Sequence, residues 1–313
     1  MTRLVVRRLL LSIPLVLVVS VLTFALQSLT SSDAARTSLG TQFDPERYAQ
    51  LRSELGLDDS VPAQYWHWLT ELFSGSMGTS VFTGQPVVEA LNARLGVTIS
   101  LIVGATLVAA IVGIGLGVAS ALRRRGPLRG LVDVLSLVGL ALPSFWLGLV
   151  LVAVFAVALP VFPATGYVEP SESVGDWMLS LVLPVVTLSV AAVAVIAKQT
   201  RDAMADALDR EFVWALRARG IPERRIILRH ALRSAAIPVV TVLGLLFVGL
   251  LSGTVLVETV FALPGLGSTA VQATTQADLP MIQGVAVYFA LIVVAVNLLI
   301  DVAYGWLNPK VRA

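Results

Sequence analysis

The chain has 313 residues, of which 57% are hydrophobic and 13% are charged, and its mean hydropathy is +0.86. A soluble domain carries about 25% charged residues, so this chain cannot cover a water-facing surface and its solvent is largely lipid. The formal net charge is +2, and with no cysteine and two histidines the chain excludes disulfides, thiolate chemistry and a histidine-rich metal cage.

Six apolar segments are long enough to cross a bilayer core, which needs about 20 helical residues. They are 9–29, 97–121, 132–158, 181–199, 236–259 and 284–306. The first follows Arg3, Arg7 and Arg8 as a signal peptide would, but its apolar run is too long and no clear small-residue cleavage site follows it. We therefore expect an uncleaved first span and an all-α integral membrane protein. Pro143 and Pro184 are tolerable inside spans where neighbouring helices satisfy the freed carbonyl groups.

A hydrophilic outer region, 30–96, separates the first two spans, so the chain divides into 1–29, 30–96 and a core of 97–313. Its aromatic residues suit a helix lying at the membrane surface, where amphipathic rings settle: Tyr65, Trp66 and Trp68. Its glycines predict turns: Gly75, Gly78 and Gly84. The region either caps the outer mouth, receives a partner, or only stabilises the spans.

Arginines and lysines are sorted along the chain, which predicts its orientation. If six spans alternate, one side receives both termini and the second-to-third and fourth-to-fifth connections, which contain Arg123, Arg124, Arg125, Arg129, Arg201, Arg210, Arg217, Arg219, Arg224, Arg225, Arg229, Arg233, Lys310 and Arg312. The other side receives Arg36, Arg47, Arg52 and Arg94, all in the outer region. Both termini are therefore expected in the cytoplasm.

Motifs for catalysis are absent from the sequence. There is no G-x-x-x-x-G-K-[ST] phosphate cradle, no H-E-x-x-H and no G-x-S-x-G. Ser144 follows Pro143, but no histidine or lysine in another span can activate it, so it is expected to hydrogen-bond near the proline kink. We predict no catalytic residue, no metal site and no nucleic-acid partner.

Three acidic residues lie in or near the spans, where a central charge costs about 2.5–3.5 kcal/mol: Asp133, Glu258 and Asp301. None is clearly at the midplane and they do not form a proton relay. Asp301 either pairs with an arginine of the inner loops or has a direct role in transport.

Two small-xxx-small pairs let backbones approach and favour assembly with another membrane subunit: Gly113 with Gly117, and Gly249 with Gly253.

The inner connection at about 200–235 is long enough for two helices. An apolar stripe at helical spacing marks the first: Met204, Leu208, Phe212 and Ala215. This helix should stop at Gly220, a good C′ residue, and Pro222 suits the first turn of the next helix. The result is a helix–turn–helix corner. It either transmits force to a partner or lies on anionic lipid, attracted by its arginines.

This segment resembles the EAA loop of ABC-transporter permeases, in particular the B-type subunit of the dipeptide/oligopeptide/nickel family. The match runs from Glu211 through Gly220 and on to Pro238, although Leu216 stands where the family has alanine. The resemblance implies that ten hairpin residues couple to an ATPase: Glu211, Phe212, Leu216, Arg217, Ala218, Gly220, Ile221, Pro222, Glu223 and Arg224.

Further signatures occur in the family's order. They include 55–58, 78–80 and 83–87 in the outer region, 142–148 in the third span, 257–267 after the fifth span, and Asn297, Asp301, Tyr304 and 306–312 at the end. The candidates for the translocation pathway or gate are Pro143, Ser144, Phe145, Trp146, Glu258 and Phe261.

The resemblance implies a type I ABC importer permease fold with six transmembrane helices, in a bacterial cell membrane. Its expected partners are a C-type permease, two ATP-binding subunits that carry ATP and magnesium, and an extracytoplasmic binding protein; the chain itself binds no cofactor. The expected cargo is a di- or oligopeptide. The alternatives are a nickel chelate or another small solute, or an ion-coupled secondary carrier that needs no ATPase. A membrane enzyme would require a reactive constellation that the sequence lacks.

Overall fold

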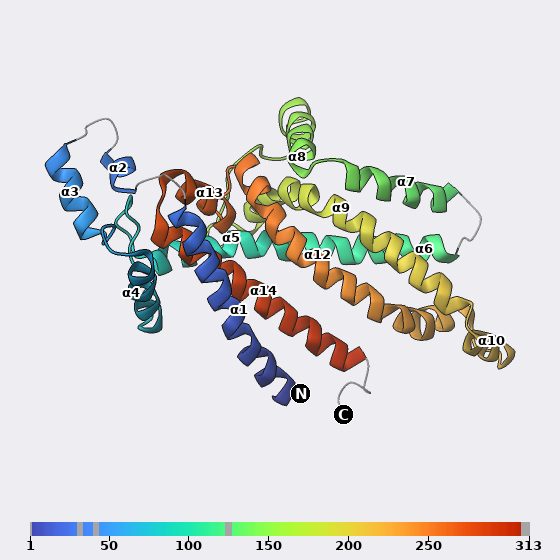
Figure 1. Ribbon diagram of the computed structural model, residues 1–313. Helices are drawn as coiled ribbons and strands as arrows, with labels where there is room; N and C mark the ends of the chain where they lie inside the picture. Colours follow the sequence, from blue (N-terminus) through green and yellow to red (C-terminus); the bar gives the residue numbers. More distant parts are fainter. Residues whose placement is uncertain (1, 30–33, 40–43, 123–126, 308–313) are drawn as a thin grey trace. The chain divides into compact units, whose positions relative to one another are not determined.

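The computed structural model describes residues 2–29, 34–39, 44–122 and 127–307 (Figure 1). Within these residues the chain is helical, apart from one isolated antiparallel bridge between Thr79 and Pro86. Two compact units divide the chain. The core unit is Ile99–Leu263 with Val296–Ala313, and the loop unit is Thr2–Thr98 with Pro264–Ala295. The expected arginines 123–125 and the basic residues 310 and 312 lie outside the described residues.

Five helical stretches are long and apolar enough to cross a membrane. They contain or closely match the first, second, fourth, fifth and sixth expected spans: Leu10–Ser28, Val87–Leu122, Val174–Leu208, Glu223–Val260 and Leu279–Ala303. The third expected span, 132–158, is a bent pair of helices instead. α7 (Pro127–Ala141) meets α8 (Ser144–Val152) and the π-helical η2 (Ala153–Ala158) at an angle of 99°. The kink expected at Pro143 is therefore a full break, and with this bent pair counted as one span the described residues contain six candidate spans, as expected.

The break in the third span has a local cause at Pro143. Proline has no backbone N–H and biases the residue before it away from helical dihedrals. Pro143 has ψ 131°, so it leaves the helical region, and α8 begins at the next residue. Pro184, by contrast, stays inside the continuous helix α9 (Val174–Leu208), as expected. The same residue type thus gives two outcomes in two neighbouring spans.

Helix α9 is the centre of the core unit. It begins at Ser173, whose side chain accepts a hydrogen bond from the backbone N–H of Asp176, as a good N-cap does. It packs against α6 (Ile114–Leu122), α7, α8 and α12 (Leu232–Val260). Its 35 residues span about 50 Å, whereas the hydrocarbon core is about 30 Å thick. One or both ends of α9 must therefore project from the bilayer.

Glycines let α9 approach its neighbours. A Cβ at Gly117 would lie 2.5 Å from Thr200 Cβ, and one at Gly113 would lie 2.8 Å from Ile196 Cγ2. A Cβ at Gly253 would lie 2.9 Å from Leu188 Cδ1, also on α9. The expectation that these small residues serve another subunit is therefore wrong for all three, because they pack within this chain.

The loop unit contains helices of its own. They are α1 (Thr2–Ser28), α2 (Ala34–Leu39), α3 (Pro45–Glu54), α4 (Val61–Phe73), the start of α5 (Val87–Val108), α13 (Leu266–Gln276) and the start of α14 (Leu279–Leu307). The outer region is thus folded, and a cavity of about 280 Å³ lies among α1, the turn after α3, α4 and the start of α14. The three expected turn glycines all have positive φ.

Two aromatic residues of α4 are packed inside the loop unit: Tyr65 contacts α1, and Trp68 lies beside Tyr65. The Tyr65 hydroxyl is 2.9 Å from Ser20 Oγ, and its ring centroid is 5.5 Å from that of Phe24. Trp68 is 7% exposed, whereas Trp66 is 64% exposed. Trp66 is therefore the most exposed of the three rings, and the expected placement of this helix at the membrane surface stays a prediction.

A buried hydrogen bond ties the outer region to the chain that precedes the last helix. Ser80 Oγ donates to Asp278 Oδ2 at 2.5 Å, and Asp278 Oδ1 accepts from the backbone N–H of Met281 in the first turn of α14. Asp278 is 2% exposed, so this pairing satisfies a carboxylate that burial would otherwise penalise.

Candidate functional site

The hairpin is formed by α10 (Glu211–Ala218), the turn 219–222 and α11 (Glu223–Arg225), which continues through π-helical η3 (Ile226–Ala231) into α12. We call residues 211–224 the hairpin; in Figure 1, α10 lies beyond the end of α9. The helix is interrupted between Leu208 and Glu211, so α9 and α10 are separate helices. The expected apolar stripe therefore splits. Met204 and Leu208 are buried on α9, whereas Phe212 and Ala215 are exposed on α10.

The turn closes as a Schellman motif. The N–H of Ile221 bonds to the carbonyl of Leu216 at 3.2 Å, and the N–H of Gly220 bonds to that of Arg217 at 2.9 Å. Gly220 has φ +72°, with open space around the position of a Cβ. Glycine is favoured here because its backbone adopts the left-handed region without penalty. The expected stop at Gly220 is confirmed, and Pro222 is the N-cap of the next helix.

An ion pair across the turn joins the helices on its two sides, α10 and α11, which are the two arms of the hairpin. Arg217 Nη2 is 2.6 Å from Glu223 Oε1, and Arg217 Nε is 3.1 Å from Glu223 Oε2, so the guanidinium binds the carboxylate in two places. These hydrogen bonds raise the pKa of Arg217 above its ordinary value. The guanidinium also lies 5.7 Å from the centroid of the Trp214 ring. The arms of the hairpin are thus joined by side chains as well as by the turn.

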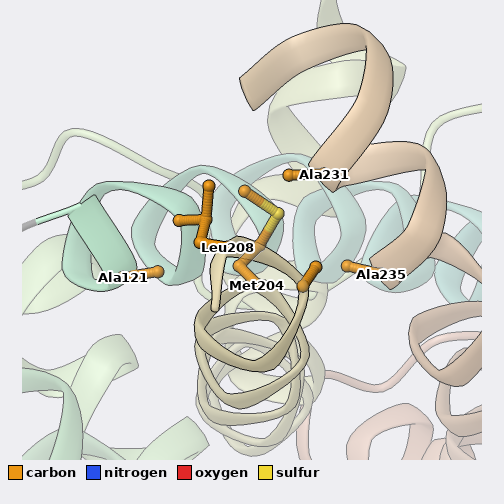
Figure 2. Packing of buried hydrophobic residues seen from close by; sticks show 6 residues of the cluster. Ala121, Met204, Leu208, Ala231 and Ala235 are labelled. Carbon is orange, nitrogen blue, oxygen red and sulfur yellow. The ribbon is translucent and has the colours of Figure 1, made fainter. Parts of the chain in front are cut away.

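The base of the hairpin rests on a cluster of small and apolar residues in the core unit. Figure 2 shows the side chains of Met204 and Leu208 between Ala121 on one side and Ala231 and Ala235 on the other. Together with Ala207 they form a buried core in which every member is at most 5% exposed. It joins the ends of α6 and α9 to η3 and α12.

The ten predicted coupling residues lie at the surface of the hairpin. A buried residue that was not predicted from the sequence lies between them in the chain and anchors the hairpin. None of the ten is buried, and Leu216 and Ile221 are half-buried while the other eight are exposed. Val213, which is fully buried, fixes α10 to the core unit. Trp214 is 64% exposed, and a tryptophan in a connection rich in charged residues is a signal that could have added it to the prediction.

A second ion pair holds α7 to α9 near the hairpin. Arg201 Nη1 is 2.5 Å from Asp133 Oδ1, and Arg201 Nε is 3.0 Å from Asp202 Oδ1. The residue Arg201 is 8% exposed. The sequence placed Asp133 at the inner end of the third span and Arg201 in an inner connection, but it did not pair them, because 68 residues separate the two.

The six pathway candidates do not share one environment. Phe145 and Trp146 are 45% and 47% exposed at the start of α8, with Pro143 exposed and Ser144 half-buried beside them. Glu258 and Phe261 are 0% and 1% exposed at the end of α12. The Phe261 ring packs near Gly148, where a Cβ would lie 3.2 Å from it. Only the α8 group is therefore available to a solute or a partner.

The remaining acidic candidate, Asp301, is half-buried in α14. Its pairing with an inner arginine stays a prediction. Among the described residues no group of three or more histidine, aspartate or glutamate side chains is placed to hold a metal ion. The hairpin is therefore the best-defined candidate site in the part of the chain that the structure describes.

Comparison with known proteins matches nearly the whole chain to two family profiles. Residues 112–313 match "Binding-protein-dependent transport system inner membrane component", and residues 1–102 match the profile of its N-terminal part. A chain in a structure titled "Inward facing conformations of the MetNI methionine ABC transporter" aligns with a TM-score of 0.55 at 16% identity, over 71% of this chain and 97% of that one.

Curated relatives match at full length. A "Putative peptide transport system permease protein" of Brucella abortus (strain 2308) is 38% identical over 312 residues, covering 100% of this chain and 99% of the relative. "Glutathione transport system permease protein GsiC" of Pectobacterium atrosepticum is 38% identical, covering 98% of each chain. "Probable D,D-dipeptide transport system permease protein DdpB" of Escherichia coli (strain K12) is 36% identical, covering 95% of this chain and 94% of the relative.

Proposed function

The chain belongs to the family of binding-protein-dependent transport system inner membrane components, and on that premise we propose that it is a permease subunit of an ATP-driven importer of short peptides. In this proposal the chain forms part of a path through a bacterial inner membrane. It carries no ATPase motif, so the energy reaches it from another chain.

The hairpin is the observation that carries the proposal. A segment that transmits force must be stiff, and this one is closed by a Schellman turn and by the two-point Arg217–Glu223 pair. It must also be joined to the spans, and the alanine-rich core at its base connects it to α6, α9 and α12. A flexible connection of the same length would dissipate the motion in loop rearrangement.

The hairpin surface suits a partner that works in the cytoplasm. The basic connections of the chain favour that side for 209–233, and ATP is available there. In our proposal two ATP-binding subunits hold ATP and magnesium, and the hairpin docks on one of them through its exposed residues. ATP binding then closes the two subunits, and this closure moves the hairpin and the helices joined to its base.

A second permease of the C type is expected to complete the path. The chain has few spans of its own, and the exposed face of α8 includes two aromatic residues, Phe145 and Trp146. Gly249, around which no atom lies within 4 Å of a Cβ position, is a further place where a neighbouring helix fits closely. An extracytoplasmic binding protein would deliver cargo to the outer side of the membrane, where region 30–96 is expected.

Short peptides are the proposed cargo because the relatives above are named for peptide, glutathione and D,D-dipeptide transport. These three cargoes share a short chain of amide bonds. The shared chemistry favours recognition of backbone and termini over any one side chain, and it makes a nickel chelate the less favoured cargo.

Purification and reconstitution test the proposal. The tagged chain is extracted from its native membrane, the co-purifying chains are identified by mass spectrometry, and the complex is placed in proteoliposomes with its binding protein. We expect an ATP-binding subunit and a second permease in the complex. Uptake of a labelled dipeptide should require ATP on the side of the bilayer that the ATP-binding subunits face. Uptake driven by an ion gradient without any ATPase would contradict it.

A further inference from the structure

A basic pocket lies beside the hairpin within the core unit. It has a volume of about 300 Å³, and its walls are Phe212 from α10, Arg229 and His230 from η3, and Arg233 and Ser234 from the first turn of α12. We use "basic pocket" for these five residues. Two arginines, a histidine, a serine and a phenylalanine therefore line one open, shallow hollow.

No acidic side chain of the described residues compensates the positive charge of the basic pocket. No carboxylate lines it. Among the described residues no ion pair engages Arg229 or Arg233, whereas Arg217 pairs with Glu223 and Arg201 pairs with Asp133. Arg219 and Arg225 of the same segment have no ion pair among the described residues either, but Arg229 and Arg233 also line one pocket, and this combination indicates a site that receives its negative charge from outside the chain.

The donors of the pocket match a phosphoryl group. Arg229 and Arg233 are four residues apart, about one helical turn, and so are His230 and Ser234. Each planar guanidinium can donate two parallel hydrogen bonds to phosphate oxygens. The hydroxyl of Ser234 and a ring N–H of His230 supply further donors. A tetrahedral phosphate can use donors from several directions, whereas a planar carboxylate uses fewer.

The position of the pocket along the chain selects the source of the phosphate. Arg233 is the last charged residue before the uncharged run 234–257, so it lies where a span enters the headgroup region. The helical segment that follows the turn begins at Glu223, 10 residues before Arg233, so about 15 Å of helix separates Arg233 from the turn at the tip of the hairpin. Basic pockets at the cytoplasmic ends of spans are suited to anionic lipid headgroups, whereas an ATPase is expected at the tip.

We propose that the basic pocket binds the phosphate of an anionic phospholipid in the cytoplasmic leaflet. Arg229 and Arg233 hold the phosphate oxygens, and the Phe212 ring lies against the apolar part of the same lipid. Phe212 is 37% exposed, which leaves its ring available for that contact. The bound lipid holds α10 against the start of α12, so it stiffens the hairpin. The proposal rests on the proposed function only for the side of the membrane on which the hairpin lies.

Native mass spectrometry of the intact purified complex tests this directly. The complex, in a neutral detergent, is titrated with phosphatidylglycerol or with phosphatidylcholine, and the bound lipid is counted. We expect the wild-type complex to retain phosphatidylglycerol preferentially. In the double variant R229Q/R233Q, its apparent affinity for phosphatidylglycerol should fall by about tenfold or more.

Matched variants separate the pocket from general charge. R219Q/R225Q removes the same number of charges from two exposed arginines of the same segment that do not line the pocket, and it should keep the wild-type preference. R229K/R233K keeps the two positive charges but loses the paired hydrogen bonds that a guanidinium donates to a phosphate. It should bind phosphatidylglycerol at a level between those of the wild type and R229Q/R233Q. Co-purification of the partner chains verifies that each variant still assembles.

Several results would overturn the proposal. An equal loss in both glutamine variants would mean that only net charge attracts the lipid, and no loss in R229Q/R233Q would remove the site. Displacement of phosphatidylglycerol by equimolar inorganic phosphate would assign the pocket to a free anion. Lipid binding that appears only after the ATP-binding subunit is stripped would assign it to that partner. If ATP-driven uptake is intact in the same preparation while lipid binding fails, the lipid inference alone fails.

Discussion

At the residue scale, the function proposed for this chain depends on a single backbone conformation. Gly220 has φ +72° with nothing near the position of a Cβ, so the constraint is in the dihedral angles and not in packing. A β-branched side chain at that φ is a strong outlier, and the left-handed conformation costs an L-residue about 1–2 kcal/mol. Asparagine tolerates the same region better.

Gly220→Val should therefore uncouple ATP hydrolysis from uptake while the complex stays assembled in the membrane. Gly220→Asn is the matched control, because it also adds a side chain into open space but tolerates the turn. We expect peptide taken up per ATP hydrolysed to fall several-fold in the valine variant and to remain near wild type in the asparagine variant. Wild-type coupling in Gly220→Val would mean that the corner is not the transmission element.

The Arg217–Glu223 pair makes a second prediction at the same scale. Arg217→Glu alone and Glu223→Arg alone should each lower coupled uptake, because like charges then face each other across the turn. The double exchange restores opposite charges and should recover most of the uptake. Uptake assays on the four proteins give the answer. Equal activity in all four would show that the pair does not stiffen the hairpin.

At the element scale, the long helices are held together by close backbone approach and by one ion pair between α7 and α9. Gly117 has Thr200 Cβ 2.5 Å and the Ala197 carbonyl oxygen 2.6 Å from a Cβ position, whereas Gly115 in the same helix has open space. Arg201 brings α7 and α9 together through Asp133. Both features lie near the hairpin base, where loss of packing would loosen the connection to the spans.

Gly117→Ala should destabilise the chain by about 1–3 kcal/mol, because the added methyl group meets backbone atoms that cannot move aside cheaply. Gly115→Ala adds the same methyl group in the same helix without a clash. Thermal unfolding of the two purified variants should show a lower midpoint for the first and an unchanged or higher midpoint for the second. If the two midpoints matched, α6 would not be packed on α9 as described.

Asp133→Asn should cost about 1 kcal/mol, the upper range for a partly exposed ion pair, because the largely buried Arg201 then has only an uncharged acceptor on α7. Asp206→Asn changes the same functional group at an exposed position of α9, where we expect less than about 0.5 kcal/mol. Denaturant or thermal unfolding measures both. A larger loss in Asp206→Asn would contradict the role of the α7–α9 pair.

The elements that depend on local chemistry were predictable from the sequence. Five spans and the stop at Gly220 follow from hydropathy and from the left-handed turn. What depends on distant neighbours was not predictable. Pro143 breaks its span and Pro184 does not, although the residue type is the same. Tyr65 is half-buried on α1 because Ser20 and Phe24 lie there, which the pattern of α4 alone cannot reveal.

At the candidate site the same division holds. The surface residues of the hairpin could be predicted because they follow a motif along the chain. The buried supports could not, since the alanines 121, 207, 231 and 235 carry no signal except small size. Gly113 and Gly117 illustrate the difficulty further. Their spacing predicts close packing correctly, but it does not indicate whether the partner helix belongs to the same chain.

At the scale of the whole molecule, the chain is an integral membrane protein of a transport family, and its sequence contains no phosphate-cradle motif. In our proposal the loop unit takes part in the delivery of cargo by the binding protein, and the core unit connects the hairpin to the spans. The account as a whole therefore requires that a separate ATP-binding chain contacts the hairpin directly.

Photocross-linking in native membranes tests that contact most directly. A benzoylphenylalanine replaces Ala218, which is exposed on the hairpin, or Phe73, which is 80% exposed in the loop unit and serves as the control. The account predicts that illumination joins the Ala218 variant to an ATP-binding subunit, identified by mass spectrometry, and that the Phe73 variant gives no such adduct. An Ala218 variant that never captures an ATP-binding subunit, or a Phe73 variant that captures it equally well, would contradict the account.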